Sequence, residues 1–542
     1  MKEFKQIFNA YNLIGLILVS LSIWNVFTGI DAADSPYHLF HYKARITSAM
    51  AFLSGLFGVY LVSFIELIGE ARNTMIILRI INWGLIVSPF FWVLTFRFTQ
   101  VKSNLPIFLI LFCISLPTNW NTLCWDSWNR FYWFLMVFVL LKNLRDEIFK
   151  YPILIALLTL IGIGIKVTNI FTVPLLVVIF GLDSNRWMKW INVKQLGFYV
   201  IATLMGFVLF FVYESTIFEF YGLQKYIPEI DNGSHDVINL FMGSFEHLVL
   251  FVFVKVMVYL LTRRNAFESH EGMVVFITIS ILGASFYSFH NSIVALLVVF
   301  LYVEFLLFQK SNLGRNVLAV LILAPLFYAA GSDTGLFKAY WIIPQSLLLL
   351  YFFDESFFHK TKSLNFAIPK SIATVMAVLS ISTLVGNELY KSSLMVNCRK
   401  TIDIVPFNNI KVSYYDKMSY KSMGMFAMKN WDYNPNNTNV ILGSTSFLFA
   451  NTVLFENWDT IPQNHYIFRT IHTDLNGISN VMSVFNTIRN LNKVKEVSNI
   501  FYFGVLNDNA DIIRDPEKFD VKLIEKEGHM FIFKYLGNGR KN

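Results

Sequence analysis

Apolar runs long enough to cross a membrane recur through most of this chain. A transmembrane helix needs about 20 consecutive, mainly apolar residues, and runs of roughly this length alternate here with polar or basic loops. They lie at about 11–30, 47–66, 76–97, 104–118, 127–142, 151–182, 195–213, 245–262, 272–289, 292–309, 316–330, 338–353 and 368–388. The sequence therefore predicts an α-helical polytopic membrane protein with about 13 spans.

The composition agrees with this class, since 55% of the residues are hydrophobic and only 15% are charged. We interpret the first run as an anchor rather than a signal peptide, because it lacks a small-residue cleavage site and further spans follow it. The net charge is +8. In a membrane protein such an excess usually reflects cytoplasmic loops, and no basic stripe interleaved with aromatic residues predicts a nucleic-acid partner.

Basic residues in the short loops predict the orientation of the spans. Lys2 and Lys5 place the N-terminus inside. Further basic loops lie at 142–150, 186–194, 263–264, 310–315 and 360–370. With these loops inside, the polar loops that carry acids, histidines and asparagines face outside. We therefore expect an active site at the outer boundary between membrane and water. A composition rich in Phe, Asn and Lys, without a eukaryotic-style signal, favours the bacterial inner membrane.

Two runs leave the number of crossings open. The run 151–182 has basic residues at both ends and a polar break at Lys166–Asn169, which favours two short helices with the break outside. Such a break survives at membrane depth only where it is buried in protein or lines a cavity. The run 76–97 contains Ser88-Pro89, which favours a second hairpin. A single span there would reverse the orientation of everything after it.

The composition changes after about residue 390, so we divide the chain into a transmembrane bundle (1–390) and an extracytoplasmic domain (391–542). Short aromatic and β-branched runs predict strands in the second part, with a helix at 477–493. The predicted strands lie at 439–443, 465–469, 500–504, 521–525 and 530–535. Glu527-Gly528 predicts a hairpin turn between the last two, and the Asn-rich stretch 430–439 predicts a turn or linker. The second part is expected to be a small soluble α/β domain.

The loop after the first run offers the first candidates for chemistry, because Asp31 and Asp34 lie at the exit of a span. A carboxylate there is placed to activate an acceptor, or to bind a divalent metal that does so. The segment from Pro36 on is typical of a helix lying in the membrane interface, with aromatic and cationic groups for lipid and phosphate. These groups are Tyr37, His38, His41 and Arg45. The alternative is an acidic residue that merely caps this helix.

The segment Asp34-Ser-Pro-Tyr37-His38-Leu-Phe-His41-Tyr-Lys-Ala-Arg45 resembles the first external loop of the GT-C superfamily of membrane glycosyltransferases. It is most similar to the catalytic subunit of oligosaccharyltransferase. The resemblance implies a polyprenyl-phosphate-linked sugar donor, a bundle of about a dozen helices and an external C-terminal domain. It also implies that Asp34 contacts the acceptor, or a metal such as Mg²⁺ or Mn²⁺ beside it.

Two shorter segments extend the resemblance. Thr216-Ile-Phe-Glu219 is similar to an external-loop signature of bacterial oligosaccharyltransferases, which implies a substrate role for Glu219. Asn430-Trp-Asp-Tyr433 is similar to the signature that reads an acceptor sequon, although it lacks the first Trp and the final Gly. An oligosaccharyltransferase acting on protein is therefore an alternative.

Other outward loops supply further candidates. Asp126 lies among three tryptophans, which suits either a sugar platform or an interfacial aromatic belt. Polar or ionisable groups at span ends are candidates for substrate binding, although long cations also snorkel to the headgroups. These are Arg130, Lys166, His290, Asp333 and Lys338. We expect the cations to bind the donor phosphates, with Asp34, Asp31 and Asp126 as the catalytic acids.

The sequence contains no Walker loop, zinc spacing or serine-elbow motif. We therefore expect a transferase that takes its sugar from a lipid carrier and passes it to a glycan, glycolipid or protein. Two alternatives remain: a lipid or polysaccharide transporter, and a non-catalytic partner in envelope-glycan assembly.

Overall fold

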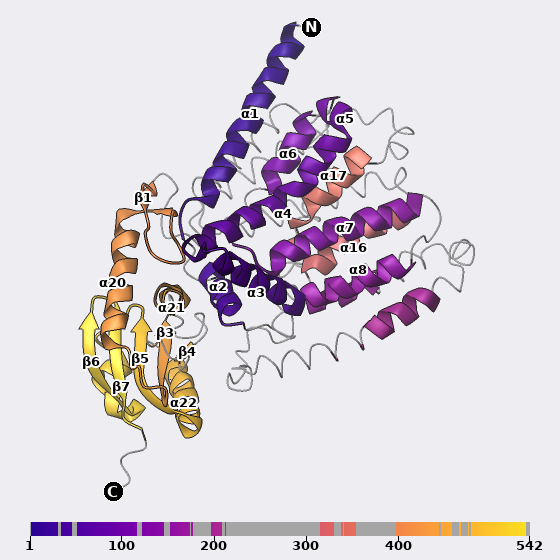
Figure 1. The fold of residues 1–542 in the computed structure, drawn as a ribbon. Coiled ribbons are helices and arrows are strands. Elements are labelled where there is room, and N and C mark those ends of the chain that lie inside the picture. Colours follow the sequence, from indigo (N-terminus) through magenta and orange to yellow (C-terminus); the bar gives the residue numbers. More distant parts are fainter. Residues whose placement is uncertain are drawn as a thin grey trace, which may run out of the picture.

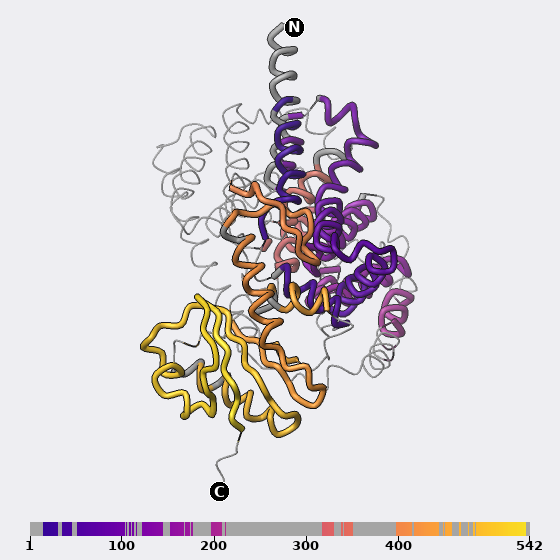
Figure 2. Tube along the Cα trace, turned by 60° about the vertical axis from the view of Figure 1, so that its left-hand side comes forward, coloured from indigo at the N-terminus to yellow at the C-terminus, as the bar shows by residue number. Residues whose placement is uncertain are grey.

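The computed structural model consists of a helical N-terminal part and a C-terminal part built on a sheet (Figure 1). It describes residues 2–30, 34–45, 51–103, 105–115, 122–145, 152–173, 175–176, 197–206, 208, 212, 315–329, 338–339, 341–353, 397–443, 446–457, 465–467, 475 and 478–537. Turning the molecule shows the C-terminal part against one end of the helical part (Figure 2). We call this the domain-side end.

The described helices of the N-terminal part follow the apolar runs. They are α1 (Lys2–Val26), α2 (Asp34–Lys43), α3 (Phe52–Leu67), α4 (Thr74–Phe96), α5 (Phe98–Ser103), α6 (Leu105–Ser115), α7 (Trp125–Arg145), α8 (Pro152–Ile165), α16 (Arg315–Ala329) and α17 (Ile343–Phe353), with 3-10 turns η2 (Ala71–Asn73) and η3 (Val167–Phe171). Helix α7 lies at the centre of one core, which includes Trp133, Ile155, Leu321 and Leu349.

The run 76–97 forms one continuous helix, so the expected hairpin there is wrong. Pro89 lies inside α4 without ending it. Ser88 instead donates a hydrogen bond from its hydroxyl to the carbonyl of Leu85. Within a long apolar helix the surrounding helices and a serine side chain accommodate the backbone change at proline, so Ser88-Pro89 does not mark a turn.

Helix α3 does not run from one end of the helical part to the other. Near its start, Ser54 donates a hydrogen bond to the carbonyl of Ile165, at the end of α8. At its other end, Glu66 pairs with Lys43 of α2, and the adjacent Arg72 accepts a backbone hydrogen bond from Asn408 of the C-terminal part. Both ends of α3 therefore lie at the domain-side end.

The expected break in the run 151–182 is confirmed. Helix α8 ends at Ile165, Lys166 is extended, and η3 follows. The second helix of the expected pair lies largely outside the described residues.

The C-terminal part contains the five expected strands in one sheet of order β4-β3-β5-β7-β6. They are β3 (Asn437–Gly443), β4 (His465–Ile467), β5 (Glu496–Phe503), β6 (Val521–Glu527) and β7 (Met530–Tyr535). Strand β3 pairs in parallel with β4 and β5, while β7 is antiparallel to both β5 and β6. The hairpin turn at Gly528 is confirmed, with a positive φ of 58° that suits glycine. Two short strands, β1 (Lys400–Thr401) and β2 (Lys411–Val412), pair separately.

Alternate residues of the strands face two different cores. Val440, Leu442 and Phe531 face one core, which contains Phe485 and Ile488 of α22 (Ile478–Val494). Ile441, Phe501 and Ile532 belong to the other. The expected helix at 477–493 is therefore confirmed, and it covers one face of the sheet.

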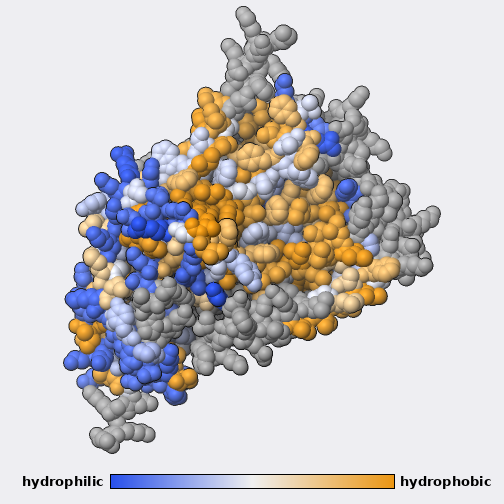
Figure 3. All heavy atoms as spheres, in the orientation of Figure 1, coloured by the Kyte–Doolittle hydropathy of each residue, from blue (hydrophilic) through white to orange (hydrophobic). Residues whose placement is uncertain are grey.

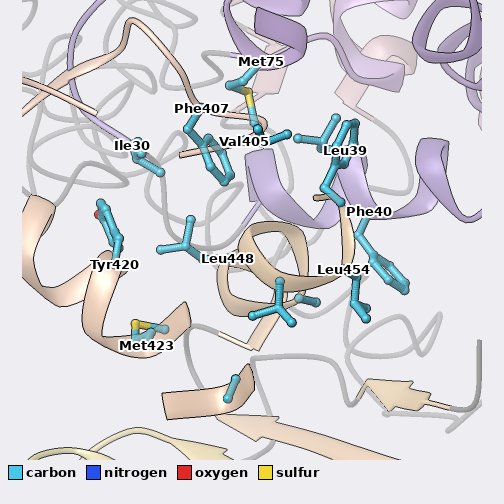
Figure 4. Close-up of a cluster of buried hydrophobic side chains, with 14 of the residues drawn as sticks. Ile30, Leu39, Phe40, Met75, Val405, Phe407, Tyr420, Met423, Leu448 and Leu454 are labelled. Atoms are coloured by element: carbon cyan, nitrogen blue, oxygen red, sulfur yellow. The ribbon is translucent and has the colours of Figure 1, made fainter. Parts of the chain in front are cut away.

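The second core joins the two parts of the chain. It includes side chains from α20 (Tyr414–Asn430) and α21 (Ser446–Leu454) together with Ile30, Leu39, Met75 and others from the N-terminal part (Figure 4). The sheet part is thus packed on the first loop and on the start of α4, rather than tethered beside them.

One described helix, Ala71–Phe96, is long and apolar enough to cross a membrane. Shorter apolar helices occur at Gly15–Val26, Phe52–Leu67, Pro152–Ile165, Gly197–Gly206 and Val317–Ala329. The described part of the chain does not establish the larger number of spans expected from the sequence. Apolar surface covers the helical part in Figure 3, whereas hydrophilic surface covers much of the C-terminal part.

Candidate functional site

The first loop and the start of α7 meet at the domain-side end. The ring of His38 lies edge-on to Trp125, with 4.4 Å between ring centroids, and Tyr37 contacts the same tryptophan at 6.4 Å. The hydroxyl of Tyr42 donates a hydrogen bond to the carbonyl of Leu123 over 2.9 Å. Helix α2, which begins at Asp34, is therefore fixed against the segment that leads to Asp126.

Asp126 is the centre of this site. It lies in the first turn of α7 and is 2% exposed. A carboxylate is stabilised there by the positive end of the helix dipole. Its Oδ2 accepts a hydrogen bond from the ammonium of Lys338 over 2.9 Å. Its Oδ1 is buried and accepts no hydrogen bond from any described residue.

Two lysines act on this carboxylate, and Arg130 lies beside the same tryptophan as one of them. Besides Lys338, Lys166 lies close enough for its charge to act on Asp126, as does the imidazole of His38. Arg130, one turn further along α7, lies against the ring of Trp341 at 5.2 Å, and Lys338 lies 5.6 Å from the same ring. Lys166, Lys338 and Arg130 are all buried. Burying a charge costs free energy unless the charge is paired and hydrogen-bonded. A cluster of buried cations is therefore a candidate binding site rather than an ordinary feature of the core.

Asparagine side chains hold the break that carries Lys166. The Asn169 amide donates to Asn129 Oδ1 over 2.7 Å and to the carbonyl of Gly162 over 2.8 Å. Its oxygen accepts a hydrogen bond from the indole of Trp133 over 2.9 Å. These bonds satisfy backbone and side-chain groups left by the end of α8. The extended residue Lys166 is thereby fixed beside α7.

The structure brings together six of the residues expected from the sequence: Tyr37, His38, Asp126, Arg130, Lys166 and Lys338. His41 lies on α2 and Arg45 after it, and the His41 ring lies tilted against Tyr37 with 4.1 Å between centroids. Asp34 begins α2, but its side chain is outside the described set. Asp31, Glu219, His290 and Asp333 also lie outside the described residues.

Sequence reasoning missed Trp341 and Asn129. Trp341 contacts both Arg130 and Lys338, and Asn129 links α7 to the break after α8. Asn129 lies three residues after Asp126, hence on nearly the same helical face, which is a signal that the sequence offered. Nothing in the local sequence marked Trp341.

The segment Trp431–Tyr433 has a structural role in the C-terminal part. The buried Trp431 ring stacks on Phe501 at 5.5 Å. Asp432 accepts hydrogen bonds from the backbone of Asn434 and the side chain of Asn437. Partial burial would raise the pKa of Asp432, but these hydrogen bonds lower it overall. The Asn-rich stretch is therefore an ordered turn between α20 and β3.

The described residues around Asp126 do not form a set of metal ligands, and the metal expected beside Asp34 falls on a side chain outside the described set. The neighbours of Asp126 are cations, and within the described residues no three His, Cys, Asp or Glu side chains gather as metal ligands. The cluster is instead suited to an anion with several oxygens, such as a phosphate or diphosphate, because ammonium and guanidinium groups form strong hydrogen bonds to these oxygens. No protein-family model matches the sequence, and no curated protein matches it.

Proposed function

We propose that this protein is a membrane glycosyltransferase of the GT-C type, which transfers a sugar or glycan from a polyprenyl-phosphate-linked donor to an acceptor at the outer face of the membrane. One observation carries the proposal: Lys166 and Lys338 are buried beside Asp126, near the helix that begins at Asp34, and Arg130 is buried one turn further along α7. The proposed phosphate site thus adjoins helix α2, whose first residue is Asp34, the candidate for activating the acceptor.

The surface of the helical part supports a membrane environment. Large apolar side chains are exposed on its helices, among them Leu16, Phe64, Phe91 and Leu204. Extensive exposed apolar surface of this kind is typical of contact with lipid or a partner. The C-terminal part, whose surface is largely hydrophilic (Figure 3), would lie outside the bilayer. It packs at the end of the helical part that carries Asp126.

The transfer step follows from the roles expected of these residues. Asp34 takes the proton of the acceptor hydroxyl or amide, and the acceptor oxygen or nitrogen attacks the anomeric carbon of the donor sugar. The bond between that carbon and the phosphate oxygen breaks, and the phosphate leaves with the bonding electrons. Lys166, Lys338 and Arg130 stabilise the negative charge on the leaving group. Asp126 keeps the Lys338 ammonium oriented toward it.

The arrangement of buried charge favours this proposal over a transporter. The buried charged residues of the described part of the chain are Arg79, Asp126, Arg130, Lys166 and Lys338. Contacts of Arg79 with the carbonyls of Val26 and Gly29 place it at the domain-side end too. A translocation path instead requires ionisable groups along the bundle.

The proposal leaves the acceptor open among glycan, glycolipid and protein. The packing of Trp431 and the turn-forming bonds of Asp432 account for these two residues without an acceptor sequon. We therefore do not extend the proposal to oligosaccharyl transfer to protein.

The experiment is a transfer assay on purified protein in detergent with a panel of polyprenyl-phosphate and polyprenyl-diphosphate sugars. We expect release or transfer of sugar from at least one donor, and its loss in Asp34→Asn without loss of expression or membrane insertion. Full activity of Asp34→Asn would contradict the catalytic role of this residue. An ion flux or lipid flux in vesicles without transfer would favour the transporter.

A further inference from the structure

The short helix α2 depends on its neighbours for its position. It has 10 residues, and isolated helices shorter than about 12–15 residues are marginal in water. The orientation of α2 is therefore set by the surfaces that enclose this helix. The same surfaces fix the backbone of Asp34, its first residue.

One of these surfaces comes from the C-terminal part. The side-chain amide of Asn451, in α21, donates a hydrogen bond to the carbonyl of Pro36 over 2.6 Å. Asn451 is 1% exposed. Pro36 lies two residues after Asp34, so this bond ties α21 to the first turn of α2.

Apolar contacts extend the same interface. Leu39 and Phe40 of α2 share a core with Leu448 and Leu454 of α21 (Figure 4). The ammonium of Lys43, at the end of α2, lies 4.9 Å from the centroid of the Phe455 ring. Helix α21 and the residue that follows it thus contact α2 at both its start and its end.

The opposite side of α2 is fixed by the helical part. Tyr42 bonds to the carbonyl of Leu123, and His38 packs on Trp125, directly before Asp126. Helix α2 therefore lies between the C-terminal part and the segment that carries the cation cluster. A shift of α21 would move Asp34 relative to Asp126.

We infer that Asn451 is a positioning residue. Through the hydrogen bond from Asn451 to Pro36, the C-terminal part fixes the start of α2, and with it Asp34, beside the proposed phosphate site. This inference rests on the proposed function for its catalytic consequence. The physical coupling between Asn451 and α2 stands independently of that function.

The test uses the full-length protein in detergent with Asn451→Leu, which removes the donor, and Asn451→Asp, which keeps the shape but replaces the amide by a carboxylate. Hydrogen exchange of the amides in 34–45 is compared with wild type, and kcat, KM and donor binding are measured separately. Asn457→Leu is the matched control, because the Asn457 amide donates to Val453 and Met428 of the C-terminal part rather than to α2.

We expect both Asn451 variants to increase exchange in 34–45 and to lower kcat at least tenfold with donor KM nearly unchanged, while Asn457→Leu does neither. A merely structural residue would lower the amount of folded protein without separating kcat from KM. Unchanged exchange in 34–45 in a folded Asn451 variant would overturn the inference. If wild type transfers no sugar, the proposed function fails, and the exchange data still decide the coupling.

Discussion

The ammonium of Lys338 donates a hydrogen bond to Asp126 Oδ2 over 2.9 Å, although the two residues are 212 positions apart in the chain. The pair joins the first turn of α7 to the segment before α17. It is buried, with 11% of the lysine side chain and 1% of the aspartate side chain exposed.

Replacing one residue of this pair should destabilise the folded protein more than replacing both residues together. We expect Asp126→Asn or Lys338→Met to destabilise the folded protein by about 3–5 kcal/mol, because each leaves a buried charge without its partner. The double variant should be less destabilised than the sum of the two. Thermal unfolding in detergent measures all three, and strict additivity would show that the residues act independently.

An exposed ion pair provides the matched control for that cycle. Lys429 pairs with Glu525 over 2.8 Å on the surface of the C-terminal part. Solvent screens such pairs, so Lys429→Met should leave both unfolding and transfer unchanged.

Glycine at position 58 allows α2 and α3 to approach each other. A Cβ at Gly58 would overlap the ring of Tyr42, whereas a Cβ at Gly84 in α4 would meet no atom within 4 Å. We expect Gly58→Ala to displace Tyr42 and to lower transfer strongly. Gly84→Ala should be neutral or stabilising by up to about 1 kcal/mol. Activity and thermal unfolding of the two variants test this contrast; equal behaviour of the pair would contradict it.

Arg79 anchors the end of α1 to α4. Its guanidinium Nη1 donates to the carbonyls of Gly29 over 2.9 Å and Val26 over 3.2 Å. Hydrogen bonds from a charged donor contribute about 1.5–3 kcal/mol each, so Arg79→Met should destabilise the protein by at least about 2 kcal/mol. Lys102→Met, at an exposed position of α5, is the control. A folded, equally stable Arg79→Met variant would show that these carbonyls find other donors.

His465 should make stability depend on pH. Its ring lies between Phe40 and Trp431, and burial, with a smaller effect from Lys495, lowers its pKa from 6.5 to about 4. Between these values the unfolded chain binds a proton that the folded protein does not, so stability falls as the pH falls, by up to about 1.4 kcal/mol per pH unit. His465→Leu should lose this contribution, visible as a smaller drop in Tm from pH 7 to pH 5. The exposed His529→Gln should keep the wild-type profile; a His465→Leu profile equal to wild type would refute the assignment.

Local sequence patterns predicted helices and strands correctly where a pattern is compatible with only one kind of secondary structure. Short runs of β-branched and aromatic residues predicted β5 and β7, and the polar break at Lys166–Asn169 predicted the end of α8. The run 47–66 has the composition of a span, yet α3 lies along one end of the helices. Its position is decided by contacts such as Ser54 with Ile165, which depend on residues distant in sequence.

The sequence predicted the ionisable residues of the candidate site. It did not predict which of these residues contact each other. Asp126, Lys166 and Lys338 were each expected at an outer loop, because ionisable residues at span ends are conspicuous. Their convergence depends on how α8 and α17 pack on α7, and Trp341 joins the cluster only through that packing. No local pattern records such long-range packing.

The most direct test of the account is the binding of polyprenyl diphosphate to the purified protein. Thermal stabilisation by this lipid should be measured for wild type, Lys166→Met and Arg130→Met, with Lys429→Met as the control. We predict saturable stabilisation of wild type and the control, and a weakening of at least tenfold in apparent affinity in each of the other two variants. Equal binding by all four proteins, or none by wild type, would contradict the claim that the buried cations form the donor phosphate site.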